Sequence, residues 1–257
     1  MAQKERIEKL KNILMKTNGS AIKDLATELE VTEMTVRRDL KKLIDSGDAV
    51  LLRGVAVYRP KAVSVEAPLY SIREEKEKMS DEKERIGKAA AALLEPGDVV
   101  FLDVGTTVER MAASIEKNMH LTAVCFAFNT MVELQKKNLS QIIMGGGYYH
   151  PTSEVFESEA MVPIMNGLRA TKAFIAPSAC DMDHGLTCPA QYDKTIKRLE
   201  INNSKRRILL ITSQKFDTIK STAFASWDEI DQVITDSGIP DRWKKFLSDK
   251  GIEVKIV

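Results

Sequence analysis

Residues 32–47, TEMTVRRDLKKLIDSG, decide how the N-terminal part of this chain folds. Their apolar members recur with the period of an α-helix, so one face is apolar and the opposite side is largely basic. The hydroxyl of Thr32 can cap the first turn, and Gly47 stands where a left-handed stop residue is expected. The apolar face comprises Val36, Leu40, Leu43 and Ile44, the opposite side comprises Met34, Arg38, Lys41 and Lys42, and Thr35 and Arg37 lie on the two flanks. The stretch therefore predicts a helix that presents a basic face to solvent.

The neighbouring residues complete a DNA-binding motif. Residues 21–29 form a second amphipathic segment, which Ser20 can cap, and two residues separate it from Thr32. Two short helices joined by so tight a turn are typical of a helix-turn-helix, whose second helix enters the major groove. Residues 49–58, AVLLRGVAVY, predict a two-stranded wing with Arg53 at its tip. The alternative is a three-helix bundle with a solvated basic face. DNA binding is favoured because turn, cap, basic face and wing agree.

This segment resembles the DeoR-type bacterial transcription regulators. The matching residues are Val31-Thr32, the run TVRRDL at 35–40, Leu43, Gly47 and Arg53-Gly54. The wing departs from the family pattern, since residues 54–56 stand where the family usually has a His and paired glycines. The resemblance implies that this module binds double-stranded operator DNA. The candidate DNA-binding residues are Thr32, Thr35, Arg37, Arg38, Lys41, Lys42 and Arg53.

Composition excludes several classes of protein. The chain has 257 residues, 44% of them hydrophobic, which is enough for one large domain or two small ones. No apolar run approaches the roughly 18 residues of a membrane helix, and the charged N-terminus is unlike a signal peptide, so we expect a cytoplasmic protein that does not enter a membrane. Three cysteines argue against a disulfide framework. The net charge is +1 overall, +3 over residues 1–60 and −2 over the rest, so a basic module precedes a nearly neutral body.

Beyond residue 72 the pattern predicts an α/β domain. Residues 73–94 are predicted to form one long helix, and from Pro96 apolar strands alternate with amphipathic helices. Such alternation predicts a mostly parallel sheet covered on both faces. Strands are expected at 99–104, 121–126, 141–144, 172–176, 208–212, 232–235 and 253–257, and helices at 106–117, 129–137, 192–203 and 241–249. The domains are therefore a winged helix-turn-helix at 1–58, a linker with two prolines at 59–72, and an α/β domain at 73–257.

Three loops are expected beyond the C-terminal ends of the strands, where such sheets bind ligands. The loop 103–107, DVGTT, opens a helix, so its free amides and the hydroxyls of Thr106 and Thr107 suit an anion. The second loop holds Asn129-Thr130, and the third holds Gly145, Gly146 and Gly147. Lys197 and Lys215 could pair with a phosphate. The alternatives are a capped helix, a flexible glycine turn and two ordinary surface lysines.

The family resemblance extends over these loops. It implies an effector domain that resembles the sugar-phosphate isomerases and responds to a phosphorylated sugar. The matching positions are Asp103, Gly105, Thr106, Thr107, Asn129, Gly145, Gly146, Gly185, Lys197 and Lys215. Residues 121–125 with Asn129-Thr130 look like the deoxyribonucleoside-operon members of the family, which makes deoxyribose 5-phosphate the first candidate effector. Thr212 stands where the family commonly has an Asp.

Two other sites compete with this interpretation. Cys180, His184 and Cys188 are spaced like metal ligands, but Gly185 and Pro189 rule out the helix that would align them, so we expect no metal and no cofactor. Asp181 and Asp183 could be the acid/base pair of an isomerase, but alternate residues of an extended loop point apart. The prediction is a regulator, most simply a repressor, that works as a dimer or tetramer because one winged module reads a half-site. A sugar-phosphate isomerase with an accessory DNA-binding module is the alternative.

Overall fold

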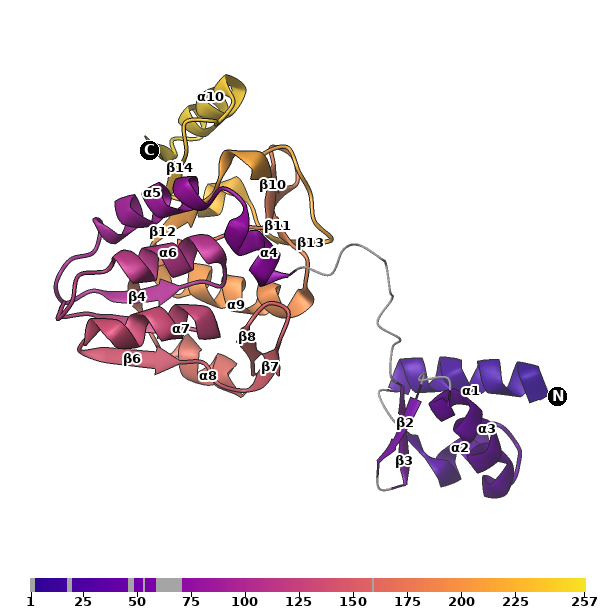
Figure 1. Ribbon diagram of the computed structural model, residues 1–257. Helices are drawn as coiled ribbons and strands as arrows, with labels where there is room; N and C mark the ends of the chain where they lie inside the picture. The colour runs from indigo at the N-terminus through magenta and orange to yellow at the C-terminus, as the bar shows by residue number, and fades with distance from the viewer. Residues whose placement is uncertain (1–2, 18–19, 46–48, 53, 59–70, 159) are drawn as a thin grey trace. The chain divides into compact units, whose positions relative to one another are not determined.

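A computed structural model describes residues 3–17, 20–45, 49–52, 54–58, 71–158 and 160–257. The chain divides into two compact units, Met1–Pro68 and Leu69–Val257, and each is considered by itself (Figure 1). The predictions made for Gly47, for Arg53 and for most of the linker, residues 59–70, lie outside the described residues.

The first unit is a winged helix-turn-helix, as predicted. Its elements are α1 (Gln3–Thr17), β1 (Ser20–Ala21), α2 (Ile22–Glu28), α3 (Glu33–Asp45), β2 (Ala49–Leu52) and β3 (Val55–Tyr58). The strands form an antiparallel sheet in the order β1-β3-β2. The core contains Leu10 and Leu14 of α1, Leu25 of α2, and Val36 and Leu40 of α3. The period-3.6 pattern of the sequence therefore packs as it predicts.

Two predictions for this unit are wrong. Ser20 does not cap α2, because Ser20 and Ala21 pair with β3 as a third strand, and the Ser20 hydroxyl lies 2.8 Å from the Thr17 hydroxyl. The sheet contact thus takes the residues that precede the helix. Ile44, predicted to face inward, is 38% exposed near the end of α3.

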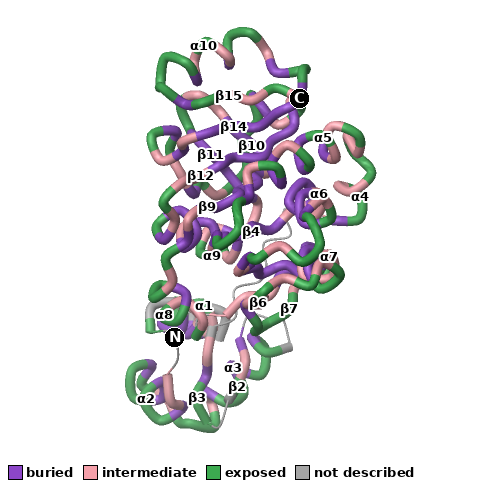
Figure 2. The backbone as a smooth tube through the Cα atoms, turned by 90° about the vertical axis from the view of Figure 1, so that its left-hand side faces the viewer, coloured by how far each residue is buried: buried purple, intermediate pink, exposed green. Residues whose placement is uncertain are grey.

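The second unit is built on seven parallel strands in the order β15-β14-β12-β9-β4-β5-β6. The strands are β4 (Val99–Leu102), β5 (Thr122–Cys125), β6 (Gln141–Met144), β9 (Ala170–Ile175), β12 (Ser204–Leu210), β14 (Gln232–Thr235) and β15 (Glu253–Ile256). The strands β4, β5 and β14 are apolar and mostly buried because helices cover both faces of the sheet. Figure 2 shows β14 buried, whereas α10 (Asp241–Asp249) has exposed sides. The predicted α/β class is therefore confirmed.

Two layers of helices cover this sheet. On one face α5 (Ser80–Ala91), α6 (Thr106–Ser114) and α7 (Phe128–Leu134) pack against β4 and β5. On the other face lie α8 (Met161–Asn166), α9 (Gln191–Asn202) and α10. Short 3-10 turns occupy Gln135–Lys137, Ser213–Lys215 and Trp227–Glu229. Across the described part of the chain, no helix is both long and apolar enough to cross a membrane.

The structure of this unit differs from the predictions made from the sequence in two places. The predicted single helix at 73–94 is two helices, α4 (Ile72–Glu77) and α5, because Lys78 is extended and Met79 adopts a left-handed φ of +48°. The sequence also gave no sign of a small antiparallel sheet, β10-β11-β13, or of the hairpin β7–β8. These strands are β7 (Tyr148–His150), β8 (Val155–Glu157), β10 (Ala179–Asp181), β11 (Gly185–Cys188) and β13 (Thr222–Ala225).

Candidate functional site

Helix α3 carries the candidate DNA-binding face. The Thr32 hydroxyl accepts a hydrogen bond from the Thr35 amide at 3.3 Å, so Thr32 caps the helix as the sequence indicates. Below the surface, the carboxylate of Asp39 accepts a hydrogen bond from the Arg6 guanidinium at 2.5 Å, which fixes α3 against α1. Solvent reaches the side chains of Met34, Arg37, Arg38, Lys41 and Lys42. The helix therefore presents a basic face over a core face that is fully packed.

The second unit has a pocket at the C-terminal ends of its central strands, which we call the Gly105 pocket. Figure 1 shows β4 and β6 pointing toward the side where the β7–β8 hairpin and α4 lie. The first turn of α6 opens into the pocket, and Gly105 allows this turn through a φ of +141°. The lining consists of Val104, Gly105, Thr106, Thr107, Ser153, Val155, Ala176, Pro177, Ser178, Asp193, Lys197 and Lys215. The free amides and two hydroxyls of a helix N-terminus thus face two lysines.

Asp103 and Lys197 form a buried ion pair beneath this pocket. Asp103 is fully buried and accepts hydrogen bonds from the amides of Val104 at 2.7 Å and Ala176 at 2.8 Å. Lys197 donates to Asp103 and, at 2.9 Å, to the Ala176 carbonyl. Burial favours the neutral amine, but the charges of neighbouring carboxylates, that of Asp103 above all, raise the pKa of Lys197. Asp103 therefore joins the ends of β4 and β9 and holds Lys197 charged.

Two further carboxyl groups of α9 belong to the same cluster. Burial raises the pKa of Asp193 to about 6, against the opposing charge of Lys197 and with the help of Asp103. Glu200 is fully buried, and burial, followed by the charge of Asp103, holds its pKa well above the usual value. Neither carboxyl oxygen of Glu200 has a hydrogen-bond partner among the described residues, which fits a carboxyl that is protonated and uncharged.

Lys215 is the cation on the other side of the pocket. It is half-buried and donates to the Pro177 carbonyl at 3.1 Å. Burial, and then the charge of nearby Lys83, lowers its pKa to about 8. Lys83 is itself buried, donates to the Glu75 carbonyl, and has a pKa lowered mainly by burial. A cation with so few anionic neighbours is well placed to receive an anionic ligand.

The structure separates the other predicted residues from this pocket. Asn129 donates to the Glu109 carboxylate at 2.7 Å, and Thr130 is buried at the start of α7. A Cβ on Gly145 would lie 2.3 Å from the Phe126 ring, so this glycine allows close packing. Gly146 is exposed. None of these four residues lines the Gly105 pocket in the part of the chain that the structure describes.

The sequence did not predict that the β7–β8 hairpin contributes to the Gly105 pocket; we call this hairpin the roof of the pocket. Ser153 and Val155 come from the β7–β8 hairpin, which had no recognisable strand pattern. The Ser153 hydroxyl lies 3.0 Å from the Tyr192 hydroxyl, and the Tyr192 ring stacks on His150 with centroids 3.9 Å apart. The hairpin is thus fastened to α9. Asp193 was missed too, although an acidic residue four positions before Lys197 on one helix face was a usable signal.

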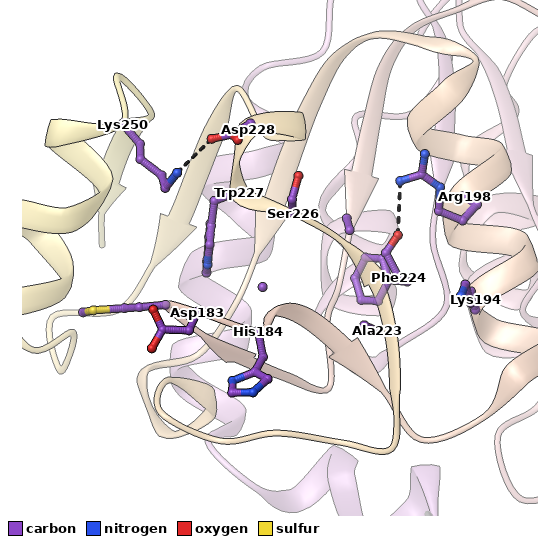
Figure 3. A pocket seen from close by; sticks show the side chains of 13 residues that line it. Asp183, His184, Lys194, Arg198, Ala223, Phe224, Ser226, Trp227, Asp228 and Lys250 are labelled. Carbon is purple, nitrogen blue, oxygen red and sulfur yellow. Dashed lines mark hydrogen bonds and ion pairs between the residues drawn. The ribbon is translucent and has the colours of Figure 1, made fainter.

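A larger hollow lies elsewhere, between the small antiparallel sheet and the C-terminal segment (Figure 3). Its volume is about 570 Å³. Two of its cations have protein partners: Arg198 donates to Glu229 at 2.6 Å and to the Phe224 carbonyl at 3.2 Å, and Lys250 lies 2.8 Å from Asp228.

The residues of the two competing sites do not line the Gly105 pocket in the described structure. Asp181 accepts hydrogen bonds from the amides of Asp183 and His184, both at 2.9 Å, so it closes the turn between β10 and β11. Cys180 and Cys188 are buried on neighbouring strands, and burial raises the pKa of the Cys188 thiol to about 11. Among the described residues there is no group of three or more His, Cys, Asp or Glu that could hold a metal ion.

Comparison with known proteins covers both units. The model of the DeoR-like helix-turn-helix domain matches residues 6–60, and that of the DeoR C terminal sensor domain matches residues 78–237. The deoxyribose operon repressor of Escherichia coli is 28% identical over 252 residues, which are 98% of each chain. The lactose phosphotransferase system repressor of Lactococcus lactis is 27% identical over 250 residues, 96% of each chain. A ribose 5-phosphate isomerase of Methanocaldococcus jannaschii is 12% identical, with a TM-score of 0.40 over 53% of this chain and 54% of that one.

Proposed function

The chain belongs to the DeoR family of DNA-binding transcription regulators, and we propose that it represses sugar or nucleoside catabolic genes until a phosphorylated sugar occupies the Gly105 pocket. The relatives described above are repressors by name. A repressor needs one surface for DNA and one site for the molecule that controls it. Each unit of this chain supplies one of the two.

The basic face of α3 supports the DNA half of the proposal. Arg37 and Arg38 lie in the second turn of the helix, where side chains reach phosphates and base edges in the major groove. Lys41 and Lys42 lie one turn further on, where cations suit the DNA backbone. We assign DNA contact to these four residues together with Thr32, Thr35 and Arg53.

The first turn of α6 facing Lys215 and Lys197 is the observation that carries the effector half. Amides, hydroxyls and a helix dipole on one side and ammonium groups on the other suit a phosphate better than a neutral sugar. Deoxyribose 5-phosphate is our first candidate because of the full-length similarity to a deoxyribose operon repressor. We assign the phosphate to Gly105, Thr106, Thr107 and the two lysines.

Assembly forms part of the proposal. One winged helix reads only half of a symmetric operator, so a dimer or tetramer is needed to read the whole.

The isomerase alternative has less support. Its proposed acid/base pair, Asp181 and Asp183, does not line the Gly105 pocket in the described structure, and Asp181 is occupied in closing a turn. The relatives named above are regulators, which favours a binding site over a catalytic one.

Substitution of Thr106 by Val tests the proposal. It removes a hydroxyl from the phosphate site and keeps the shape of the side chain. Loss of a hydrogen bond to a charged group costs roughly 1.5–3 kcal/mol, so affinity for deoxyribose 5-phosphate should fall about tenfold or more. Operator binding without effector should be unchanged. Thr122→Val, at the opposite end of the sheet, is the matched control.

Calorimetry with deoxyribose and deoxyribose 5-phosphate, and gel shifts with the upstream DNA of the gene, measure the two halves separately. Equal affinity of the wild-type protein for the sugar and its phosphate ester would contradict the phosphate assignment.

A further inference from the structure

The wall of the Gly105 pocket contains a carboxylate oxygen without a partner. Asp193 is 6% exposed, and its Oδ1 atom has no hydrogen-bond partner among the residues that the structure describes. The side chain starts in the first turn of α9 and lines the same pocket as Thr106 and Lys215. A buried acceptor without a partner is destabilising, so buried polar groups normally have partners.

The cations near Asp193 hydrogen-bond to groups other than Asp193. Lys197, one turn further along α9, donates to Asp103 and to the Ala176 carbonyl. His150 pairs with Glu157 at 2.8 Å on the roof of the pocket. Of the charges that act on Asp193, those of Lys197 and His150 favour ionisation, and those of Asp103 and Glu157 oppose it. Ionised Asp193 therefore has an acceptor to offer to a molecule in the pocket.

The pocket thus makes two different demands on its occupant. The α6 N-terminus and Lys215 require an anion, whereas Asp193 repels an anion and requires a hydrogen-bond donor. Inorganic phosphate meets the first demand, but its only hydrogen-bond donors lie on the anion itself, which Asp193 repels. A phosphate ester of a sugar meets both, because its hydroxyl groups are donors at a distance from the charge.

We infer that Asp193 accepts a hydrogen bond from a hydroxyl group of the effector and selects polyhydroxylated phosphate esters over simple phosphate. This inference rests on the proposed function, since it concerns the same pocket. Sites that hydrogen-bond a hydroxyl discriminate strongly against analogues without it, because their own polar group is then left unpaired. Asp193 is therefore the specificity-determining residue, and the α6 N-terminus supplies affinity for any phosphate.

Substitution of Asp193 by Leu separates the two roles. Calorimetry on the full chain would use deoxyribose 5-phosphate, ribose 5-phosphate, glucose 6-phosphate, fructose 1-phosphate and inorganic phosphate. Wild type should bind at least one sugar phosphate tenfold or more tightly than inorganic phosphate. Asp193→Leu should lose most of that advantage and should bind inorganic phosphate as well as wild type or better, because a negative charge is gone. Gln191→Leu, exposed on the same helix, is the matched control.

Asp193→Asn provides a second measurement should the Leu variant fail to fold. It keeps the shape and loses the charge, so its affinity for the best sugar phosphate should depend less on pH between 7 and 5 than that of wild type. The phosphate of the ligand also titrates near pH 6, but it does so equally with both proteins.

The outcomes distinguish the inference from the proposed function. Wild-type selectivity that survives in Asp193→Leu, or pH profiles that are equal for wild type and Asp193→Asn, would overturn the role of Asp193 and leave the phosphate site standing. A wild-type protein that binds no sugar phosphate more tightly than inorganic phosphate would overturn both.

Discussion

Arg38 is the residue on which sequence-specific DNA binding is expected to depend most. It lies on the exposed side of α3, and its neighbour Arg37 lies 3.9 Å from Glu33 of the preceding turn. A base-reading arginine contributes about 1–3 kcal/mol of operator affinity, whereas a phosphate contact affects all sequences alike. Arg38→Ala should therefore weaken operator binding by that amount and scrambled DNA less, and Arg37→Ala should weaken both. Gel-shift titrations measure this, and unchanged affinity in both variants would remove α3 from the interface.

Ionisation of Asp193 should lower the free energy of unfolding of the protein. Its pKa is about 6 in the folded state against an ordinary value of 3.8, because burial penalises the charge. The folded state thus binds the proton more tightly than the unfolded state, so stability falls as pH rises through this window and stays lower above it. The loss should be about 2–3 kcal/mol between pH 4 and pH 7.

Urea unfolding of wild type and Asp193→Asn over that pH range isolates this contribution. The free energy of unfolding of wild type should decline relative to that of the variant as pH rises. Parallel curves would show that Asp193 keeps an ordinary pKa.

At the scale of elements, the glycine run after β6 separates packing from ligand contact. A Cβ on Gly147 would lie 2.2 Å from the Glu157 carbonyl oxygen, and its φ is +133°. Gly146 has no atom within 4 Å of such a Cβ. Gly147→Ala should therefore destabilise the β7–β8 hairpin by about 1–3 kcal/mol or more, and Gly146→Ala should stay within about 0.5 kcal/mol of wild type. Urea unfolding tests the pair. A loss of sugar-phosphate affinity in Gly146→Ala would show that Gly146 contacts the effector, as the sequence predicts.

The elements that sequence predicted are those with a continuous apolar pattern. Strands such as VVFL of β4 and QVIT of β14 are buried on both faces, so their apolar residues make them recognisable in the sequence. The strands β7, β8 and β10 have three residues each and include a His, Glu or Asp, so no continuous apolar run marks them. No glycine or proline marks the break between α4 and α5 at Met79. The contacts of these two helices with the rest of the unit override the strong helix propensity of the segment, so the sequence alone predicts one helix.

The same distinction applies to the pocket. Gly105, Thr106 and Lys215 directly follow strands of the central sheet, so topology alone brings them together. Ser153 and Asp193 reach the pocket through a hairpin and a helix whose placement depends on tertiary packing, namely the contact between Ser153 and Tyr192. Topology likewise led to Asn129 and Gly145, whose strands end beside the pocket but whose neighbours are Glu109 and Phe126.

Across the whole molecule, the roof of the pocket connects with the segment that leads to the DNA-binding unit. The amide of Ile72, the first residue of α4, donates to the Thr152 carbonyl at 2.9 Å, and Ser153 lines the pocket. Lys76 of the same helix lies 3.0 Å from Glu109 of α6, whose first turn belongs to the proposed phosphate site. Both contacts place α4 next to the elements that an effector would touch. A ligand changes DNA affinity only through contacts that differ between two states, and these are the described contacts nearest to the linker.

Because one copy of the chain has only a small basic surface for DNA, we expect it to assemble into a dimer or a larger oligomer. The basic excess of the chain is confined to residues 1–60, with a net charge of +3, so one copy has little general attraction for DNA. A winged module alone reads a half-site, and specificity for an operator then requires a second copy at a fixed spacing. The full chain should therefore be at least dimeric in analytical ultracentrifugation at concentrations on the order of tens of micromolar, well above typical specific DNA affinities. The operator should contain repeated half-sites, and deleting one should weaken binding far more than scrambling the spacer. A monomer that binds one half-site as tightly as the full operator would contradict this arrangement.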